Sequence, residues 1–275
     1  PGLHSPTPSA DAVMKLLVVL ALVAAASAAA SSERPALPRS ALPRSALRLR
    51  GGVGEQPKTG KVWVTSTFTR DHCRVMTELL HYLGAYLGPR ALAPQTIEAI
   101  MLTVNSVNAC PYCTGLHGQL ARMADAVVDN KAPEVIYATT FAEEAGRGSK
   151  VQAAYSKLAA TIGDGKALSV RALCWALLWG KTTGNSINAV RGKIAQLRLL
   201  SISPFELLMF VFYGPLFLII GVLNKMLLAA PKVPAWFSAV FGAMLWVPQA
   251  IHITIAGFVS LVLRLLAAPV VGLSL

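Results

Sequence analysis

The chain has 275 residues, of which 54% are hydrophobic and only 14% are charged, against a usual charged share of about 25%. This length allows one large domain or a domain with appendages, and the low charge predicts membrane segments in addition to a folded core. The formal net charge is +12, but five arginines fall in one short N-terminal tract. No other basic patch is interleaved with aromatic residues, so we expect no nucleic-acid partner.

The first sixty residues have the composition of targeting segments. Residues 1–13 precede Met14 and are interpreted as upstream translation outside the folded protein. Residues 14–28 have the pattern of a secretory signal peptide, with Lys15, an apolar run and an Ala-Ser-Ala cleavage site. Residues 29–60 form a basic linker rich in Arg, Ser, Ala and Pro, which is transit-peptide composition.

A signal peptide followed by a transit peptide resembles the bipartite leader of nuclear-encoded plastid proteins in algae with secondary plastids. The resemblance implies a plastid membrane, either thylakoid or envelope, as the location. The alternative is a disordered basic linker in a protein of the secretory-pathway membranes.

Apolar residues at helical spacing dominate the middle of the chain, and no segment shows the alternation of a strand. Pro94 and Pro111 stand where a helix can begin, since the first turn tolerates the missing N–H of proline. We therefore predict an all-α domain over residues 61–198. The expected helices cover residues 67–87, 94–108, 111–126, 133–145, 150–162 and 168–194.

Residues 199–275 contain two long uncharged stretches. Residues 207–224 are just long enough to span a bilayer, and Pro215 within them is tolerated in membrane helices. Residues 233–263 exceed one straight span, and we expect Pro248 to break them into an interfacial piece with Trp236 and Trp246 and a spanning piece. This pattern predicts a membrane-associated helical hairpin, the alternative being a buried helical pair at an oligomer interface. His252 in the second stretch is interpreted either as a ligand of a pigment or haem or as a hydrogen-bonding residue between helices.

The residues with the clearest chemistry lie within residues 98–117. Cys110 and Cys113 form a C-x-x-C pair, His117 follows Cys113 by four residues, and Glu98 precedes Cys110 by twelve. On a helix that begins at Pro111, Cys113 and His117 share a face. A thiol at the first turn of a helix has its thiolate stabilised by unpaired N–H groups, an imidazole can take its proton, and a carboxylate can orient the imidazole. The pattern predicts a redox dithiol with its own base.

The E-x11-C-x2-C-x3-H spacing of these four residues resembles the AhpD-like branch of the carboxymuconolactone decarboxylase superfamily, over about residues 61–197. The resemblance implies an all-helical fold, homo-oligomers, and reduction of a peroxide or a protein disulfide with no cofactor beyond the redox-active Cys110–Cys113 disulfide. It also implies that Cys113 attacks, Cys110 resolves, and His117 and Glu98 relay the proton. A thioredoxin or lipoyl dithiol would be the reductant. Asn185 and Asn188 match residues of a late helix that packs beside the redox helix in that family, and we expect them to be structural.

Several alternatives remain at this stage. Helix-terminus electrostatics favour Cys110 as the attacking thiol. A zinc site would need a fourth ligand such as Cys73 or His72, although we expect Cys73, Cys174, His72 and His81 to be packing residues. Decarboxylase chemistry would not need the cysteine pair.

The alternative to an enzyme is a non-catalytic accessory subunit of a plastid membrane complex such as a photosystem supercomplex. In either case membrane lipid is an expected partner.

Overall fold

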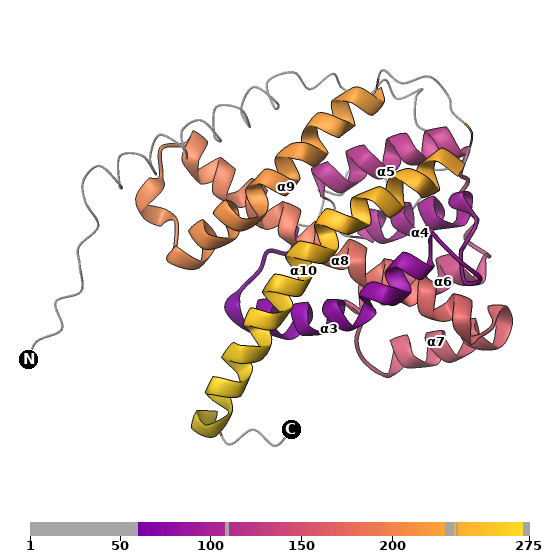
Figure 1. Ribbon diagram of the computed structural model, residues 1–275, viewed down its shortest axis with the longest axis horizontal. Coiled ribbons are helices and arrows are strands. Elements are labelled where there is room, and N and C mark those ends of the chain that lie inside the picture. The colour runs from indigo at the N-terminus through magenta and orange to yellow at the C-terminus, as the bar shows by residue number, and fades with distance from the viewer. Residues whose placement is uncertain (1–59, 108–109, 229–233, 235, 272–275) are drawn as a thin grey trace, which may run out of the picture.

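The chain folds into an assembly of helices (Figure 1). The structure is a computed structural model that describes residues 60–107, 110–228, 234 and 236–271. The expected upstream segment, signal peptide and almost all of the basic linker fall in residues 1–59 and so lie outside the described residues. The described part contains eight α-helices and no strand, which confirms the all-α prediction. The helices are α3 (Thr65–Gly84), α4 (Pro94–Val107), α5 (Pro111–Ala124), α6 (Pro133–Glu143), α7 (Ser149–Ile162), α8 (Asp164–Ala195), α9 (Pro204–Leu228) and α10 (Trp236–Val271), with a short 3-10 helix (Leu199–Ser201) before α9.

Helix α8 is the central helix of the fold. Its 32 residues pack against α3, α4, α5, α6, α7 and α9, and most of its side chains between residues 167 and 190 are buried. A helix that is apolar on every side must be enclosed on every side. The other helices therefore form a shell around α8.

Of the two apolar C-terminal helices, α9 belongs to that shell, and α10 packs on its outside. Helix α9 packs mainly on α5 and α8, and α10 packs mainly along α3, so the two make little contact with each other. In Figure 1, α10 crosses the bundle over α3 and its last turns project beyond it. Buried residues of α9 and α10, among them Phe210, Phe217 and Ile253, belong to the same hydrophobic core as the earlier helices.

The expected break at Pro248 is wrong, because α10 is one continuous helix from Trp236 to Val271. Contacts with α3 on both sides of the proline hold it straight. Trp246 Nε1 donates to the carbonyl of Leu79 at 3.0 Å, and Tyr82 Oη donates to Gln249 Oε1 at 3.0 Å. The lost backbone hydrogen bond is thereby offset by packing and by polar contacts to the neighbouring helix.

The outer faces of α9 and α10 are apolar and exposed. Both helices are long and apolar enough to cross a membrane, and only 39% and 22% of their most apolar segments are buried within the protein. On α10 the exposed apolar side chains recur every three or four residues and form one stripe: Trp236, Val240, Met244, Val247, Ile251, Ile255, Phe258, Val262 and Leu266. A contiguous apolar surface of this length is typical of contact with lipid or with another protein.

Glycines bring α10 close to α3. A Cβ at Gly242 would lie 2.2 Å from the ring of Tyr86, and a Cβ at Gly257 would lie 2.7 Å from Sδ of Met76. Small residues at a helix interface let two backbones approach closely, as in membrane helix pairs. The position of α10 therefore depends on these two glycines.

We expect Gly242→Ala to destabilise the protein by about 1–3 kcal/mol, because the rigid Tyr86 ring must move to admit the methyl group. Gly221→Ala is the matched control, since nothing lies within 4 Å of its added Cβ on α9, and there alanine should be neutral or stabilising by up to about 1 kcal/mol. Thermal unfolding of both variants in one detergent tests this. Equal melting temperatures would contradict the packing argument.

Candidate functional site

Cys110 and Cys113 lie at the N-terminus of α5. Cys110 is the residue immediately before the helix and is extended, Pro111 is the first helical residue, and Cys113 lies in the first turn. Both thiols are free, and Cys110 is fully buried while Cys113 is slightly exposed. The unpaired N–H groups of a first turn favour negative charge on sulfur at this position.

The two sulfurs interact directly. The Cys113 thiol donates a hydrogen bond to Cys110, and this bond lowers the pKa of Cys110 against the opposing effect of burial. The same bond and burial raise the pKa of Cys113 well above its ordinary value. Of the two thiols, Cys110 is therefore the one that loses its proton more readily, and its thiolate accepts the hydrogen bond from Cys113.

Glu98 and His117 form the predicted carboxylate–imidazole pair. Glu98 is on α4, His117 is one turn after Cys113 on α5, and Nδ1 of the imidazole lies 3.0 Å from Oε2 of the carboxylate. Donation from Nδ1–H to an ionised Glu98 leaves the lone pair on Nε2. His117 can then act as a base in the cavity that it shares with Cys113.

That cavity is small, at about 40 Å³, and its walls come from six helices. Cys113 and His117 of α5 face residues of α3, α4 and α8 across it, and the C-terminal helices complete the enclosure with Phe217, Ile220 and Gln249. A water molecule needs roughly 10–15 Å³ of such volume, so the cavity has room for a few waters or one small molecule. The segment expected to be a separate membrane hairpin thus covers the dithiol.

Lys181 on α8 is a site residue that the motif did not include. Its side chain is only 1% exposed, its Nζ donates to the carbonyl of Val104 on α4, and burial lowers its pKa to about 7. The Lys181 ammonium favours the thiolate of both Cys110 and Cys113. It therefore adds to the lowering of the Cys110 pKa and partly opposes the rise of the Cys113 pKa. The sequence did contain a signal for this residue, because Lys181 stands in an otherwise apolar stretch. A lone charge that becomes buried needs a partner, which points to a site.

Gly184 lies one turn after Lys181 and lets α8 reach the dithiol. A Cβ at Gly184 would lie 2.8 Å from Sγ of Cys110 and 2.8 Å from the ring of Phe217. Tyr112, between the two cysteines, is held from α8 and α9: its hydroxyl accepts from Arg191, and its carbonyl accepts from Asn224 Nδ2 at 3.1 Å. The C-x-x-C turn is therefore fixed by contacts from both helices.

The structure keeps the other cysteines and histidines apart from the dithiol. His72 is fully buried, with Nδ1 bonded to the Phe68 carbonyl and Nε2 accepting from Trp179 at 3.0 Å and from Tyr213 at 2.8 Å. Burial lowers the pKa of His72 to about 4. With both nitrogens occupied, His72 is a packing residue and is not available as a fourth zinc ligand.

The remaining candidates for a metal or a structural role also lie elsewhere. Cys73 Sγ is directed at the Gly257 carbonyl at 3.8 Å, and Asn185 Nδ2 at the Lys61 carbonyl at 3.4 Å, while Asn188 is exposed. Within the described residues, no group of three or more His, Cys, Asp or Glu side chains is arranged to hold a metal ion. The helix that carries Asn185 and Asn188 packs on α5, as expected, and the residues that α8 places at the dithiol are Lys181 and Gly184.

His252 on α10 is a packing residue in contact with α9. Its Nδ1 donates to the carbonyl of Pro248 at 2.7 Å, and its ring lies 5.1 Å from that of Phe212 and 5.7 Å from that of Tyr213. This hydrogen bond lies within α10 and is not a bond between helices. The contact of His252 with α9 is made by packing of its ring.

Comparison with family models, with curated proteins and with solved structures finds no match for this chain. The site is therefore described by its own geometry.

We expect Lys181→Met to reduce the reactivity of Cys113 toward iodoacetamide at pH 7 by roughly tenfold, because the ammonium that stabilises the thiolate is removed while the length of the side chain is kept. Peptide mass analysis of alkylation from pH 5 to 10 measures the change. Lys193→Met, on the same helix but paired with Glu206, is the control and should leave the profile unchanged. An unshifted profile for Lys181→Met would contradict the assigned role.

Proposed function

We propose that the protein is an AhpD-like thiol oxidoreductase that reduces a peroxide at the Cys110–Cys113 pair. The observation that carries the proposal is that Cys113 and His117 line one cavity, with Cys110 bonded to Cys113, Glu98 bonded to His117, and the buried Lys181 beside the sulfurs. The E-x11-C-x2-C-x3-H spacing of the sequence supports the same chemistry. Enclosure strengthens each electrostatic interaction at the reacting sulfur.

In the proposed reaction, the Cys113 thiolate attacks the distal oxygen of a hydroperoxide. The O–O bond breaks, an S–O bond forms, and the leaving alkoxide takes a proton from the His117 imidazolium. Cys110 then attacks the sulfur of Cys113, a disulfide forms, and hydroxide leaves as water. Two thiols and one hydroperoxide thus give a disulfide, an alcohol and water, and an external dithiol of thioredoxin or lipoyl type restores the thiols.

Access and charge favour different cysteines as the attacking group. Cys110 carries the lower pKa but is fully buried, whereas Cys113 lines the cavity together with His117. Transfer of the Cys113 proton to a Cys110 thiolate or to His117 makes the accessible sulfur nucleophilic. We therefore assign the attack to Cys113.

The size of the cavity favours a peroxide over a protein disulfide as the oxidant. A space of about 40 Å³ enclosed by Phe217, Ile220 and Gln249 admits hydrogen peroxide or the head of a small hydroperoxide. A protein disulfide would need α9 and α10 to move away, which would expose their share of the common core.

We also propose that the protein is anchored in a plastid membrane through the exposed faces of α9 and α10. The apolar stripe of α10 supports this placement, and the leader-like sequence of residues 14–60 supports the plastid. The carboxylates that α3 carries beside α10 are paired within the protein, because Asp71 pairs with Arg70 and Arg147, and Glu78 with Arg74 and Arg171. Neutralised pairs lower the cost of placing α3 near lipid.

The second candidate function is a structural one, as an accessory subunit of a membrane complex such as a photosystem supercomplex. The observation that favours it is again the exposed apolar surface of α9 and α10, which fits a partner's transmembrane helices as well as lipid. Homo-oligomers would cover the same surface. Identification of the proteins that co-purify in mild detergent distinguishes these partners.

We expect Cys113→Ser to reduce the consumption of hydrogen peroxide with a dithiol reductant at least 100-fold, because the hydroxyl is not ionised at neutral pH. Cys174→Ala, which changes a buried thiol of α8 outside the site, should retain turnover. Rates are measured on the full chain in detergent, with the helical content checked by circular dichroism. Unchanged peroxide consumption in a folded Cys113→Ser variant would overturn the enzyme and leave the accessory subunit.

We expect the triple change of Val247, Ile251 and Ile255 to glutamate to release the protein from membranes into alkaline carbonate, because it places three charges in the exposed apolar stripe. Glutamates at Gln152, Ser156 and Ala160 on the exposed face of α7 repeat the spacing as a control and should leave the protein in the pellet. Recovery of both variants in the pellet would count against lipid contact along α10.

A further inference from the structure

A second hollow lies outside the dithiol site, at the junction of α3, the connection between α6 and α7, α8 and α10. Its volume is about 480 Å³, within the usual range of roughly 300–1,000 Å³ for ligand pockets. It is lined by Arg70, Asp71, Cys73, Arg74, Thr77, Gly146, Arg147, Trp175 and Arg264. None of these residues borders the cavity at Cys113.

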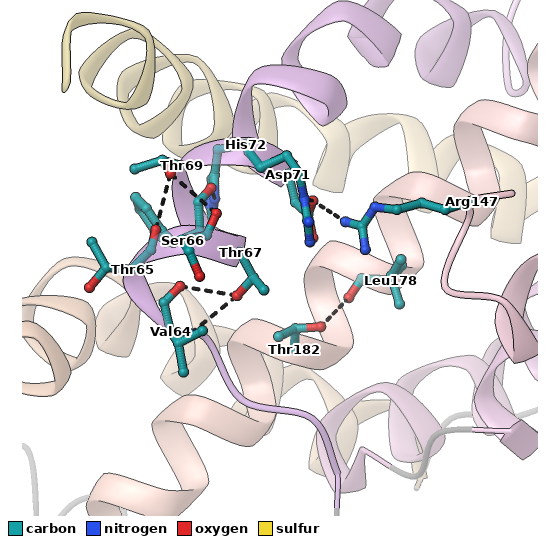
Figure 2. Close-up of polar contacts among 12 residues, drawn as sticks. Val64, Thr65, Ser66, Thr67, Thr69, Asp71, His72, Arg147, Leu178 and Thr182 are labelled. Atoms are coloured by element: carbon teal, nitrogen blue, oxygen red, sulfur yellow. Dashed lines mark hydrogen bonds and ion pairs between the residues drawn. The ribbon is translucent and has the colours of Figure 1, made fainter. Parts of the chain in front are cut away.

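Four arginines converge on this hollow against one lining carboxylate. Arg70 and Arg74 come from α3, Arg147 from the connection between α6 and α7, and Arg264 from the last part of α10. Asp71 binds Arg70 at 3.0 Å and also Arg147, which reaches across to it from its own segment (Figure 2). Glu78 outside the lining pairs with Arg74 but also with Arg171. Two carboxylates therefore face more guanidinium groups than they can neutralise, and the hollow keeps a positive potential that an anion would stabilise.

Arg264 carries the strongest part of that argument. It is exposed, and among the described side chains it has no ion-pair partner. Arg74 is held over the ring of Trp175 at 6.0 Å and bonded to Glu78 at 3.1 Å, which fixes the direction of its guanidinium. A fixed arginine and an unpaired one suit the oxygens of a phosphate group, which arginine binds in a bidentate manner.

The surroundings of Arg264 are apolar. On the same helix, the exposed Leu265 directly follows the arginine, Leu261 precedes it by about one turn, and Phe258 precedes it by nearly two turns. A ligand with a phosphate in the hollow could therefore lay a hydrocarbon chain along α10. Basic pockets beside membrane helices bind anionic lipid headgroups by this combination of charge and apolar surface.

We propose that this hollow binds the phosphodiester headgroup of an anionic glycerolipid, with its acyl chains against the exposed end of α10. Arg147 and Arg264 bind the phosphate, and Arg70 and Arg74 supply further positive charge. The proposal goes beyond the redox function. It uses the membrane placement proposed above only to supply the ligand.

The test is native mass spectrometry of the full chain, purified in detergent and titrated with phosphatidylglycerol or with phosphatidylcholine of the same acyl chains. We expect one phosphatidylglycerol to bind roughly tenfold or more tightly than phosphatidylcholine. Arg147→Gln with Arg264→Gln should abolish the preference. Arg264→Gln alone, which breaks no ion pair, should weaken it, and Arg264→Lys should restore part of it.

The matched control removes two exposed positive charges elsewhere, as Lys157→Gln with Arg198→Gln, and should keep the preference. An unaltered preference in the Arg147 and Arg264 variants would overturn the proposal. So would full displacement of the lipid by millimolar inorganic phosphate, which would make the hollow a free-phosphate site. The measurement needs neither turnover nor a membrane, so its failure is distinguishable from failure of the enzyme or of the membrane anchor.

Discussion

The enclosure of α8 is the constraint on which the rest of the structure depends. A helix buried on all sides must be apolar or find an internal partner for each polar group, and α8 carries one lysine, Lys181, in its buried length. Its partners are a backbone carbonyl of α4 and the sulfurs of α5. The same helix omits a side chain at Gly184, where Cys110 lies. The packing of the core and the electrostatics of the dithiol are therefore properties of one helix.

The helices and part of the site were predictable from local sequence. Prolines at positions 94, 111 and 133 mark helix starts in the sequence and in the structure, because proline suits the first turn. The fixed spacing of Glu98, Cys110, Cys113 and His117 needed only two neighbouring helices to bring the carboxylate to the imidazole. These features depend on short-range geometry.

The remainder depends on contacts between residues more than sixty positions apart. Three features come from segments that are distant in sequence. They are the enclosure of Cys113 by Phe217 and Gln249, the ammonium of Lys181 and the arginine-lined hollow. Pro248 was expected to end a helix because proline removes a hydrogen bond, but local preference was overridden by packing on α3. Apolar composition predicted that α9 and α10 would form a membrane hairpin separate from the domain. In the structure each of them also packs one face into the hydrophobic core of that domain.

The buried lysine links the redox state of the dithiol to a proton. When the reduced pair carries a thiolate, its charge and the ammonium of Lys181 stabilise each other in an environment with little water. A disulfide has no such charge, so oxidation leaves the ammonium without its counter-ion and favours its neutral form. Electron removal at the sulfurs would then release a proton from α8, and the midpoint potential of the pair should become more oxidising as the pH falls. A protein built in this way would sense acidification of its compartment through its core.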